Sequence, residues 1–406
     1  MIINPLIYGL TISAKLFMIL ILAVKIPEQD LAQVGLTMTT VIWIVMFFDY
    51  ENGTDIGRRI AKAESHYEQE KIFRRYCSYN STRVVIAFIA FSASLLTNNS
   101  ILALIFFLSL METIIFSSRK ILLALGLLRA SVLVEFARSA PWAIIFSSLI
   151  FFEVFEYNSY LFLATWSLSS IIVCVGTFVY LSYIFPKSVV QMPNFTEIPG
   201  LLKKNSALFI SSFFLVFVET SPRYILEFNG MYEQLAAYVF FSGFVFSIPI
   251  FMWIVSIGKN YRGLAAFHSS DENFSIFSTL ECYKMILING VLIFLFLSFA
   301  SYITVEFLVL YFINGIYEEY LPLLPFLLFL PLLIFLDSVA TNALALKGRD
   351  WQNLICAVFS ILLMMLLLAI WGREFDIWEV PWLLASTYSF SAILRFLSLW
   401  FLSGAR

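Results

Sequence analysis

Runs of about twenty apolar residues recur along the whole chain, and they constrain its fold more than any other feature. Hydrocarbon offers no hydrogen-bond partner for backbone N–H and C=O groups, so such a run in a bilayer must be a helix unless it belongs to a closed barrel. Barrel strands would be about ten residues long, with apolar and polar side chains alternating. No such alternation is present in the sequence. The chain is therefore predicted to be an all-α integral membrane protein.

Composition supports this prediction, because 61% of the 406 residues are hydrophobic and only 13% are charged. Soluble domains have roughly 25% charged residues. We place about twelve transmembrane helices on the sequence. The predicted spans are 5–24, 31–48, 83–96, 101–118, 132–152, 160–184, 205–222, 235–257, 285–303, 321–346, 354–371 and 382–402. Little more than Asn98, Asn99 and Ser100 separates the third and fourth spans, which predicts a tight helical hairpin, and the ninth can extend toward Tyr311.

A Pro-bearing polar linker between Phe185 and Gly200 divides these spans six and six. The sequence thus predicts two six-helix lobes, at residues 1–190 and 205–406, joined by a cytoplasmic linker at 191–204. Two related lobes with the substrate site at mid-depth between them are a known transporter architecture.

Basic residues are sorted to one side of the predicted spans. They gather in the even-numbered loops, whereas the odd-numbered loops are rich in Asp and Glu. The loop after the second span carries Arg58, Arg59, Lys62, Lys71, Arg74, Arg75 and Arg83, and the loop after the fourth carries Arg119, Lys120, Arg129 and Arg138. Because basic loops stay in the cytoplasm, both termini are predicted to be cytoplasmic. The net charge of −2 gives no reason to expect a nucleic-acid partner.

The sequence offers little for catalysis. It has no loop large enough to fold as a catalytic domain, and no phosphate-cradling glycine loop or nucleophile elbow at an interpretable place. The four cysteines are scattered, and the histidines, His66 and His268, lie in different loops. We therefore expect no enzyme activity, no cofactor and no metal site.

Charged residues inside the spans are the candidate functional residues, because a charge is costly in hydrocarbon and usually faces a cavity or another helix. Lys15 shares one helical face with Tyr8 and Thr11, and Arg395 shares one with Ser391 and other hydroxyl residues. Either cation could line a cavity. Each could instead snorkel to the interface, and Lys15 could pair with a neighbouring helix.

Three carboxylates also lie within spans. Glu219 is four residues before Arg223 with Pro222 between them, which suits an intrahelical ion pair as well as a site. Asp337 and Glu112 each have hydroxyl side chains nearby, so both could serve helix-to-helix hydrogen bonding instead. The prolines before Asp337, at positions 322, 325 and 331, could bend its helix.

Several segments resemble the polysaccharide flippases of the multidrug/oligosaccharidyl-lipid/polysaccharide exporter superfamily. In the first half these are Pro27-Glu28, Leu31-Ala32-Gln33-Val34-Gly35, Phe47-Phe48-Asp49-Tyr50, Gly53-Thr54 and Arg58-Arg59-Ile60-Ala61. In the second half they are residues 206–208, 223–226, 232–238, 320–324 and 342–349. The resemblance covers nearly the whole chain. One departure is Glu51, which stands where that family commonly has glycine.

The resemblance implies a two-lobed transporter, or flippase, in the bacterial inner membrane. Its substrate would be an undecaprenyl-pyrophosphate-linked oligosaccharide unit for O-antigen or other surface polysaccharide biosynthesis, moved from the cytoplasmic to the periplasmic leaflet. We expect the lipid tail to stay in the membrane while the head meets the cations Lys15, Arg223 or Arg395. Glu112, Glu219 and Asp337 are the candidates for coupling to H⁺ or Na⁺.

Two other functions remain open at the level of sequence. A cation-coupled drug or metabolite antiporter of the same fold would favour acidic residues in its cavity, and the basic and acidic candidates here are equal in number. A membrane glycan polymerase or ligase would be expected to carry a long periplasmic loop with catalytic groups. The odd-numbered loops are short, which makes this function the weaker alternative.

Overall fold

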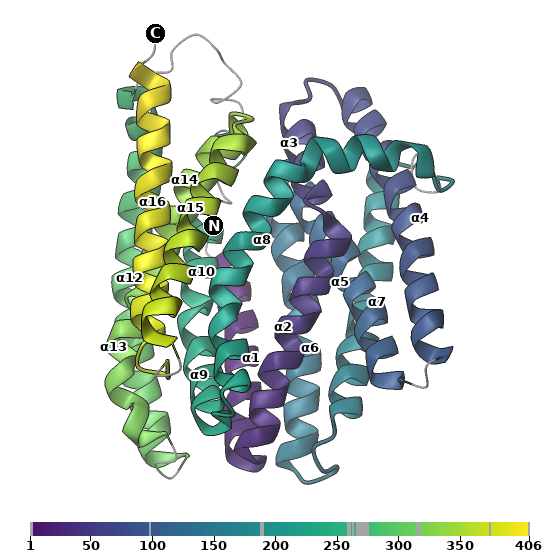
Figure 1. The fold of residues 1–406 in the computed structure, drawn as a ribbon. Coiled ribbons are helices and arrows are strands. Elements are labelled where there is room, and N and C mark those ends of the chain that lie inside the picture. Colours follow the sequence, from purple (N-terminus) through teal and green to yellow (C-terminus); the bar gives the residue numbers. More distant parts are fainter. Residues whose placement is uncertain are drawn as a thin grey trace. The chain divides into compact units, whose positions relative to one another are not determined.

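The computed structural model describes residues 3–96, 99–186, 191–257, 261, 264, 276–313, 317–372 and 375–404. Helices dominate these residues, and the described ranges contain no strand (Figure 1). Eleven helices in the described part of the chain are long and apolar enough to cross a membrane. The predicted all-α membrane fold is therefore confirmed.

Each of the first six predicted spans coincides with one long helix, and only the fifth runs past its helix, by one residue. These helices are α1 (Ile3–Lys25), α2 (Glu28–Asp49), α4 (His66–Leu96), α5 (Ser100–Ala124), α6 (Leu128–Phe151) and α7 (Ser159–Ile184). The third span occupies the C-terminal half of α4, which is not among the eleven helices. As expected, α4 and α5 pack as a hairpin, and the Asn99 side chain caps α5 by accepting from the Leu102 N–H at 3.0 Å.

The second half contains the six remaining predicted spans in more broken form. Its helices are α8 (Ile198–Phe228), α9 (Tyr232–Val245), α10 (Ser247–Ser256), α12 (Ile276–Tyr311), α13 (Leu324–Leu327), α14 (Leu330–Leu346), α15 (Asp350–Trp371) and α16 (Val380–Gly404). The ninth span does extend to Tyr311 in α12. Two short 3₁₀ helices, η1 (Phe195–Glu197) and η3 (Glu318–Leu323), precede α8 and α13.

Prolines explain the breaks in the eighth and tenth spans. Pro249 has no N–H for the carbonyl of Val245, which is where α9 ends and α10 follows. Pro322 lies in η3, while Pro325 and Pro331 stand in the first turns of α13 and α14. The prolines thus stand where the segment changes from 3₁₀ to α-helix and where α13 gives way to α14, and the expected bend stays a prediction.

Several helices present apolar surface outward, as hydrocarbon requires. Only 17% of the α12 span and 22% of the α15 span is buried in the protein. Phe296 of α12 and Ile370 of α15 are both mostly exposed. Exposed apolar surfaces of this kind are unfavourable in water, so lipid must cover them.

The basic segment after α2 is helical, which corrects its assignment to a loop. Asn52–Lys62 forms the short helix α3, and residues from His66 onward already belong to α4. One face of α3, including Ile56 and Ile60, is buried, while Lys62 is exposed. The sequence assignment failed here because only a few apolar residues mark the buried face of so short a helix.

The chain turns between α2 and α3 at Glu51, the position where the flippase family commonly has glycine. Tyr50 and Glu51 have φ angles of 45° and 55°, so two successive non-glycine residues adopt the left-handed conformation that glycine would favour. This conformation costs roughly 1–2 kcal/mol per residue. The backbone therefore turns without the glycine.

Side chains around this turn hold it in place. The Asp49 carboxylate accepts from the Gly53 N–H at 3.3 Å and from the Ser117 hydroxyl at 2.5 Å. Arg83 donates to the Asp49 carbonyl and pairs with its carboxylate at 3.5 Å. Lys120 of α5 lies 3.3 Å from the Glu51 carboxylate. These contacts compensate the strain of the turn.

The chain forms two compact units, which we call unit 1 and unit 2. Unit 1 comprises Met1–Met18 and Thr37–Phe209, and unit 2 comprises Ile19–Leu36 and Ile210–Arg406. The boundaries fall inside the continuous helices α1, α2 and α8. The lobe boundaries expected from the sequence, 1–190, 191–204 and 205–406, stay a prediction.

The described part of the segment between α7 and α8 that begins at Gln191 lies along α4 within unit 1. The Ser81 hydroxyl donates to the Gln191 carbonyl at 2.8 Å, and the Ser78 hydroxyl donates to the Met192 carbonyl at 2.9 Å. The Thr82 hydroxyl accepts from the Asn194 N–H at 3.1 Å. Further on, Lys204 of α8 binds both carboxylate oxygens of Asp55 in α3, at 2.8 and 2.7 Å. Residues 191–194 are therefore held against α4.

Candidate functional site

A cluster of five charged side chains lies among the membrane helices of unit 1. Two carboxylates, Glu112 of α5 and Glu135 of α6, are almost fully buried. Three cations surround them, namely Lys15 of α1, Arg119 of α5 and Arg138 of α6. We call this group the unit 1 charge cluster.

Glu135 is the centre of one part of the cluster. Its carboxylate accepts a hydrogen bond from Arg119 and another from Arg138 at 2.9 Å, and the Lys15 ammonium lies 3.9 Å away. The Ser139 hydroxyl, one turn along α6, donates to it at 3.2 Å. Three cations thus converge on one buried carboxylate.

Glu112 accepts three hydrogen bonds. Arg138 donates at 2.6 Å, the Ser170 hydroxyl at 2.6 Å and the Trp166 indole N–H at 2.9 Å. The Trp166 ring stacks on Trp142 with 5.0 Å between centroids, which fixes its position. Arg138 bridges both carboxylates, so the two parts of the cluster are one network.

The exposed part of this cluster is positive. The Glu112 and Glu135 side chains are only 3% and 4% exposed, whereas Lys15, Arg138 and Arg119 are 35%, 20% and 18% exposed. Three cations against two carboxylates also leave an excess positive charge. An arrangement of this kind can bind an anion at membrane depth, because its partly exposed cations retain donor groups for a ligand.

Sequence reasoning found Lys15 and Glu112 but missed the other three members. It counted Arg119 and Arg138 with the basic loop residues, although Arg138 falls inside the predicted span 132–152, and only Leu125–Leu127 separates α5 from α6. Glu112 and Arg119 are seven residues apart, and Glu135, Arg138 and Ser139 have spacings of three and four. These spacings place charges on one helical face and could have revealed the cluster.

A buried ion pair lies in unit 2. Arg395 of α16 contacts the carboxylate of Asp337 in α14 and the Ser391 hydroxyl, and its Nε donates to the Asn353 side-chain oxygen at 3.2 Å. The guanidinium is fully buried, so Arg395 does not snorkel to an interface. Its Nη2 has no hydrogen-bond partner within the described ranges. Two residues predicted for different roles therefore form one interaction.

The other predicted pair of unit 2 lies on α8. Glu219 and Arg223 are half-buried and one turn apart. Arg223 donates to the Gly35 carbonyl at 3.3 Å and to the Ser242 hydroxyl at 3.2 Å, which connects α8 to α2 and α9. Val239 packs against Gly35, where a Cβ would lie 2.2 Å from its side chain. Close approach of the helices is what brings Arg223 to a backbone carbonyl.

The six residues predicted as sites thus fall into two groups. Lys15 and Glu112 belong to the unit 1 charge cluster, while Glu219, Arg223, Asp337 and Arg395 lie in unit 2. Their assignment to substrate or coupling ion stays a prediction.

No protein-family model and no curated protein sequence matches this chain. Solved structures do. A crystal structure of MATE in the bent conformation has a TM-score of 0.60 at 14% identity, covering 99% of this chain and 94% of that chain. An outward-facing multidrug resistance MATE family transporter of the MOP superfamily has a TM-score of 0.60 at 12% identity with the same coverage.

A third similar structure is a MOP superfamily transporter from Pyrococcus furiosus, described by a reverse polarity of its binding pocket that suggests a different function. Its TM-score is 0.52 at 13% identity, over 99% of this chain and 94% of that chain. At these identities the likeness shows a shared fold. The chain therefore has the fold of MATE transporters.

Proposed function

We propose that this protein is a multi-pass membrane transporter of the MOP superfamily that flips undecaprenyl-pyrophosphate-linked oligosaccharides from the cytoplasmic to the periplasmic leaflet. Transport by alternating access would supply repeat units for O-antigen or other surface polysaccharide in the bacterial inner membrane. The transporter fold supports the general function. The sequence segments that resemble polysaccharide flippases support the substrate.

The observation that carries the proposal is the positive exposed surface of the unit 1 charge cluster. A diphosphate–sugar head carries negative charge and many hydroxyl groups, so its passage through hydrocarbon alone would be prohibitively costly. Lys15, Arg119 and Arg138 offer charge-assisted hydrogen bonds to such a head. We propose that these three cations receive the diphosphate during transport.

The two candidate cations of unit 2 are less available to bind the proposed substrate. The charge of Arg395 is matched by Asp337, and Arg223 is engaged with Gly35 and Ser242. We keep both residues in the proposed substrate path, and Arg395 Nη2 has no hydrogen-bond partner among the residues that the structure describes. Lys15 is the stronger candidate, because its side chain is a third exposed and lies at 3.9 Å from its carboxylate partner.

Glu112, Glu219 and Asp337 remain the proposed coupling residues for H⁺ or Na⁺. Arginines already neutralise Glu112 and Asp337 by direct contact. We therefore favour Glu219 as the residue that responds to the ion gradient. A Glu219→Gln variant should flip substrate passively at the wild-type rate but should no longer accelerate when a proton or sodium gradient is imposed across proteoliposomes.

The substrate proposal is tested by reconstitution. Proteoliposomes would contain a fluorescent undecaprenyl-pyrophosphate oligosaccharide, and its appearance in the outer leaflet would be measured by enzymatic accessibility of the sugar. We expect Lys15→Gln to lower the initial rate at least tenfold, with Lys25→Gln, an exposed lysine at the end of the same helix, as the matched control. Equal rates for wild type and Lys15→Gln would refute the cationic path.

A drug or metabolite antiporter is the second candidate, because the solved structures of this fold include a multidrug resistance transporter. A cavity for organic cations should expose carboxylates, whereas Glu112 and Glu135 are buried beneath cations. Efflux of cationic dyes from cells expressing the protein would favour the antiporter. The similar solved structures are transporters rather than enzymes, so we do not propose a glycan polymerase or ligase.

The predicted cytoplasmic location of both termini is part of this proposal. Single-cysteine labelling with a membrane-impermeant maleimide would test it, using a cysteine introduced at exposed Arg129 for the predicted cytoplasmic face. Protection in whole cells and labelling after lysis are expected. Labelling in intact cells would reverse the orientation.

A further inference from the structure

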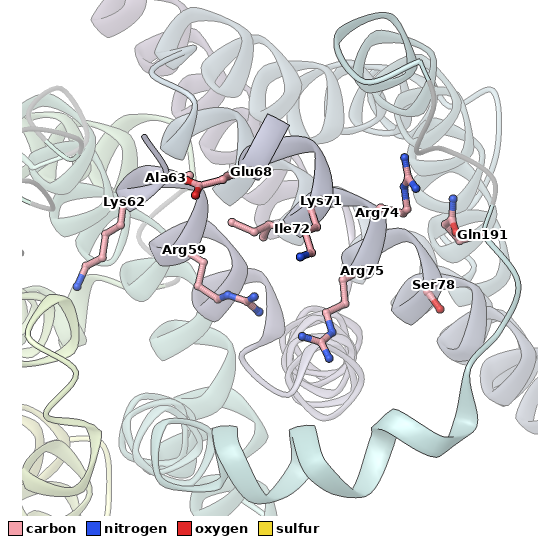
Figure 2. Close-up of a pocket in the computed structure, with 10 residues that line it drawn as sticks. All are labelled: Arg59, Lys62, Ala63, Glu68, Lys71, Ile72, Arg74, Arg75, Ser78 and Gln191. Carbon is pink, nitrogen blue, oxygen red and sulfur yellow. The ribbon is translucent and has the colours of Figure 1, made fainter. Parts of the chain in front are cut away.

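A basic groove of about 790 Å³ lies in unit 1 between α3 and the first turns of α4. Arg59 and Lys62 of α3 line it on one side, and Lys71, Arg74 and Arg75 of α4 line it on the other. Gln191 of the linker contributes to one end (Figure 2). All of these residues lie outside the eleven candidate membrane helices, and those of α4 precede its predicted span at 83–96. The groove is therefore separate from the unit 1 charge cluster.

The lining is strongly positive. Glu68 is the one carboxylate among the residues that line the groove, against the five cations. Arg59 lies 3.9 Å from Asp55 and Arg74 lies 3.6 Å from Glu70, yet their side chains remain 38% and 51% exposed. These arginines therefore keep donor groups for another anion.

Helical spacing explains why the cations gather. Lys71 and Arg75 are four residues apart, so both project from the same face of α4, and Arg59 and Lys62 have a spacing of three on α3. Figure 2 shows Arg59 of α3 and Lys71 and Arg75 of α4 projecting from the helices that border the groove. Partial desolvation and the nearby Arg58 guanidinium hold the pKa of Lys62 below its usual range.

The walls of the groove are fixed by contacts elsewhere. The strained turn before α3 is tied to α5 through Lys120, and Arg83 ties α4 to Asp49. On the linker side, the Ser78 hydroxyl binds the Met192 carbonyl. The cations are therefore presented by a scaffold that needs little rearrangement, which lowers the cost of binding a ligand.

A second hollow, of about 280 Å³, continues the groove and shares Arg59 and Arg75 with it. Lys204 and Gly200 of α8 line this hollow, together with Tyr79. The hollow adds an aromatic side chain next to the basic groove, together with Lys204, whose ammonium is held by the Asp55 carboxylate that also lines the hollow. A head larger than one phosphate group therefore has room.

We propose that this groove is a loading site that binds the diphosphate of the lipid-linked oligosaccharide before it enters the transport path. Arginine forks match two phosphate oxygens at once, and lysine adds a compact point charge, so Arg59, Arg75 and Lys71 together suit two linked phosphates. This inference rests on the proposed function. A phospholipid phosphate has related chemistry, and the experiment distinguishes the two.

Binding is measured on the full chain in nanodiscs of zwitterionic lipid, with undecaprenyl pyrophosphate as the probe. The test variant carries Arg59→Gln, Lys71→Gln and Arg75→Gln. The matched control carries Arg129→Gln and Lys203→Gln, two exposed cations outside the groove. We expect the test variant to bind at least tenfold more weakly and the control to bind as the wild type does.

A single charge reversal, Lys71→Glu, provides an independent test in case the triple variant misfolds. It should weaken binding while its melting temperature stays at the wild-type value, because Lys71 is exposed. Wild-type binding by both folded variants would overturn the proposal. Displacement of the probe by equimolar phosphatidylglycerol would also overturn it, since the groove would then be a general phospholipid site.

The failure of this proposal differs from the failure of the proposed function. If the wild type binds the probe through the groove but moves no oligosaccharide in proteoliposomes, the loading site stands and the transport proposal fails. If the triple variant binds and flips the substrate as the wild type does, transport stands and the loading site is wrong.

Discussion

Arg395 and Asp337, 58 positions apart in the chain, form a buried ion pair between α16 and α14. The sequence marked one as a substrate-binding cation and the other as a coupling acid. Their contact means that a change in either residue removes the partner of a buried charge. Loss of transport in an Arg395 variant could therefore come from a lost substrate contact or from a destabilised fold. A stability measurement must separate the two.

The first prediction concerns this pair. Arg395→Ala and Asp337→Ala should each lower the free energy of unfolding by about 3–5 kcal/mol, because each strands a charge in an apolar interior. The double variant Asp337→Leu with Arg395→Leu should recover most of that loss. Thermal unfolding in detergent measures the series.

Arg349→Ala is the matched control for this series, since Arg349 is an exposed arginine at the start of α15. It should melt as the wild type does. Additive losses in the double variant would show that the two residues do not stabilise the fold as a pair.

The second prediction concerns Glu135. Glu135→Gln keeps the volume but leaves Lys15, Arg119 and Arg138 converging without their shared anion, so it should destabilise unit 1 by several kcal/mol. Lys15→Gln should cost much less, because its Nζ is 3.9 Å from Glu135 and the side chain is partly exposed. Melting temperatures of the two variants should differ clearly. Similar melting temperatures would contradict the central place of Glu135.

The third prediction uses two glycines of α3. A Cβ on Gly53 would lie 2.9 Å from the Ser117 Cα, so Gly53→Ala should destabilise the protein by about 1–3 kcal/mol. At Gly57 the nearest atom would be the Lys120 carbonyl oxygen at 3.5 Å. Gly57→Ala should therefore be neutral, or stabilising by roughly 0.5–1 kcal/mol through helix propensity. In a thermal melt, Gly53→Ala should lower the melting temperature and Gly57→Ala should not. A lower melting temperature for both variants would disprove this packing account.

The fourth prediction concerns the linker. Ser78→Ala, Ser81→Ala and Thr82→Val together remove the hydrogen bonds that hold residues 191–194 along α4, each worth about 1 kcal/mol. The triple variant should be cleaved in the linker several times faster in limited proteolysis. Ser182→Ala is the control, because that hydroxyl bonds within its own helix to Phe178. Cleavage at an unchanged rate would mean that other contacts fix the linker.

The membrane fold was predictable because span length and apolar content are local properties that the bilayer imposes on each helix separately. The short helix α3 was missed because most of its eleven residues are polar or charged. The interruption at Phe246 was also missed, although Pro249 signals it.

The partners of the charged residues were less predictable. Lys15 and Glu112 were singled out individually, but Arg138 is the residue that links Glu112 to Glu135. Which helices meet, and at which depth, depends on packing between segments far apart in sequence. Arg119 and Arg138 were overlooked because both were counted as loop residues, although Arg138 falls inside the predicted span 132–152.

The three helices that pass from one compact unit into the other, α1, α2 and α8, limit how the protein can be divided. A chain cut in the linker would release a first fragment that still carries Ile19–Leu36, a segment that belongs to unit 2. The second fragment would lack that segment and could not complete its own unit. Neither fragment is a self-sufficient folding module, so recombination between related genes at the linker would replace parts of both units at once.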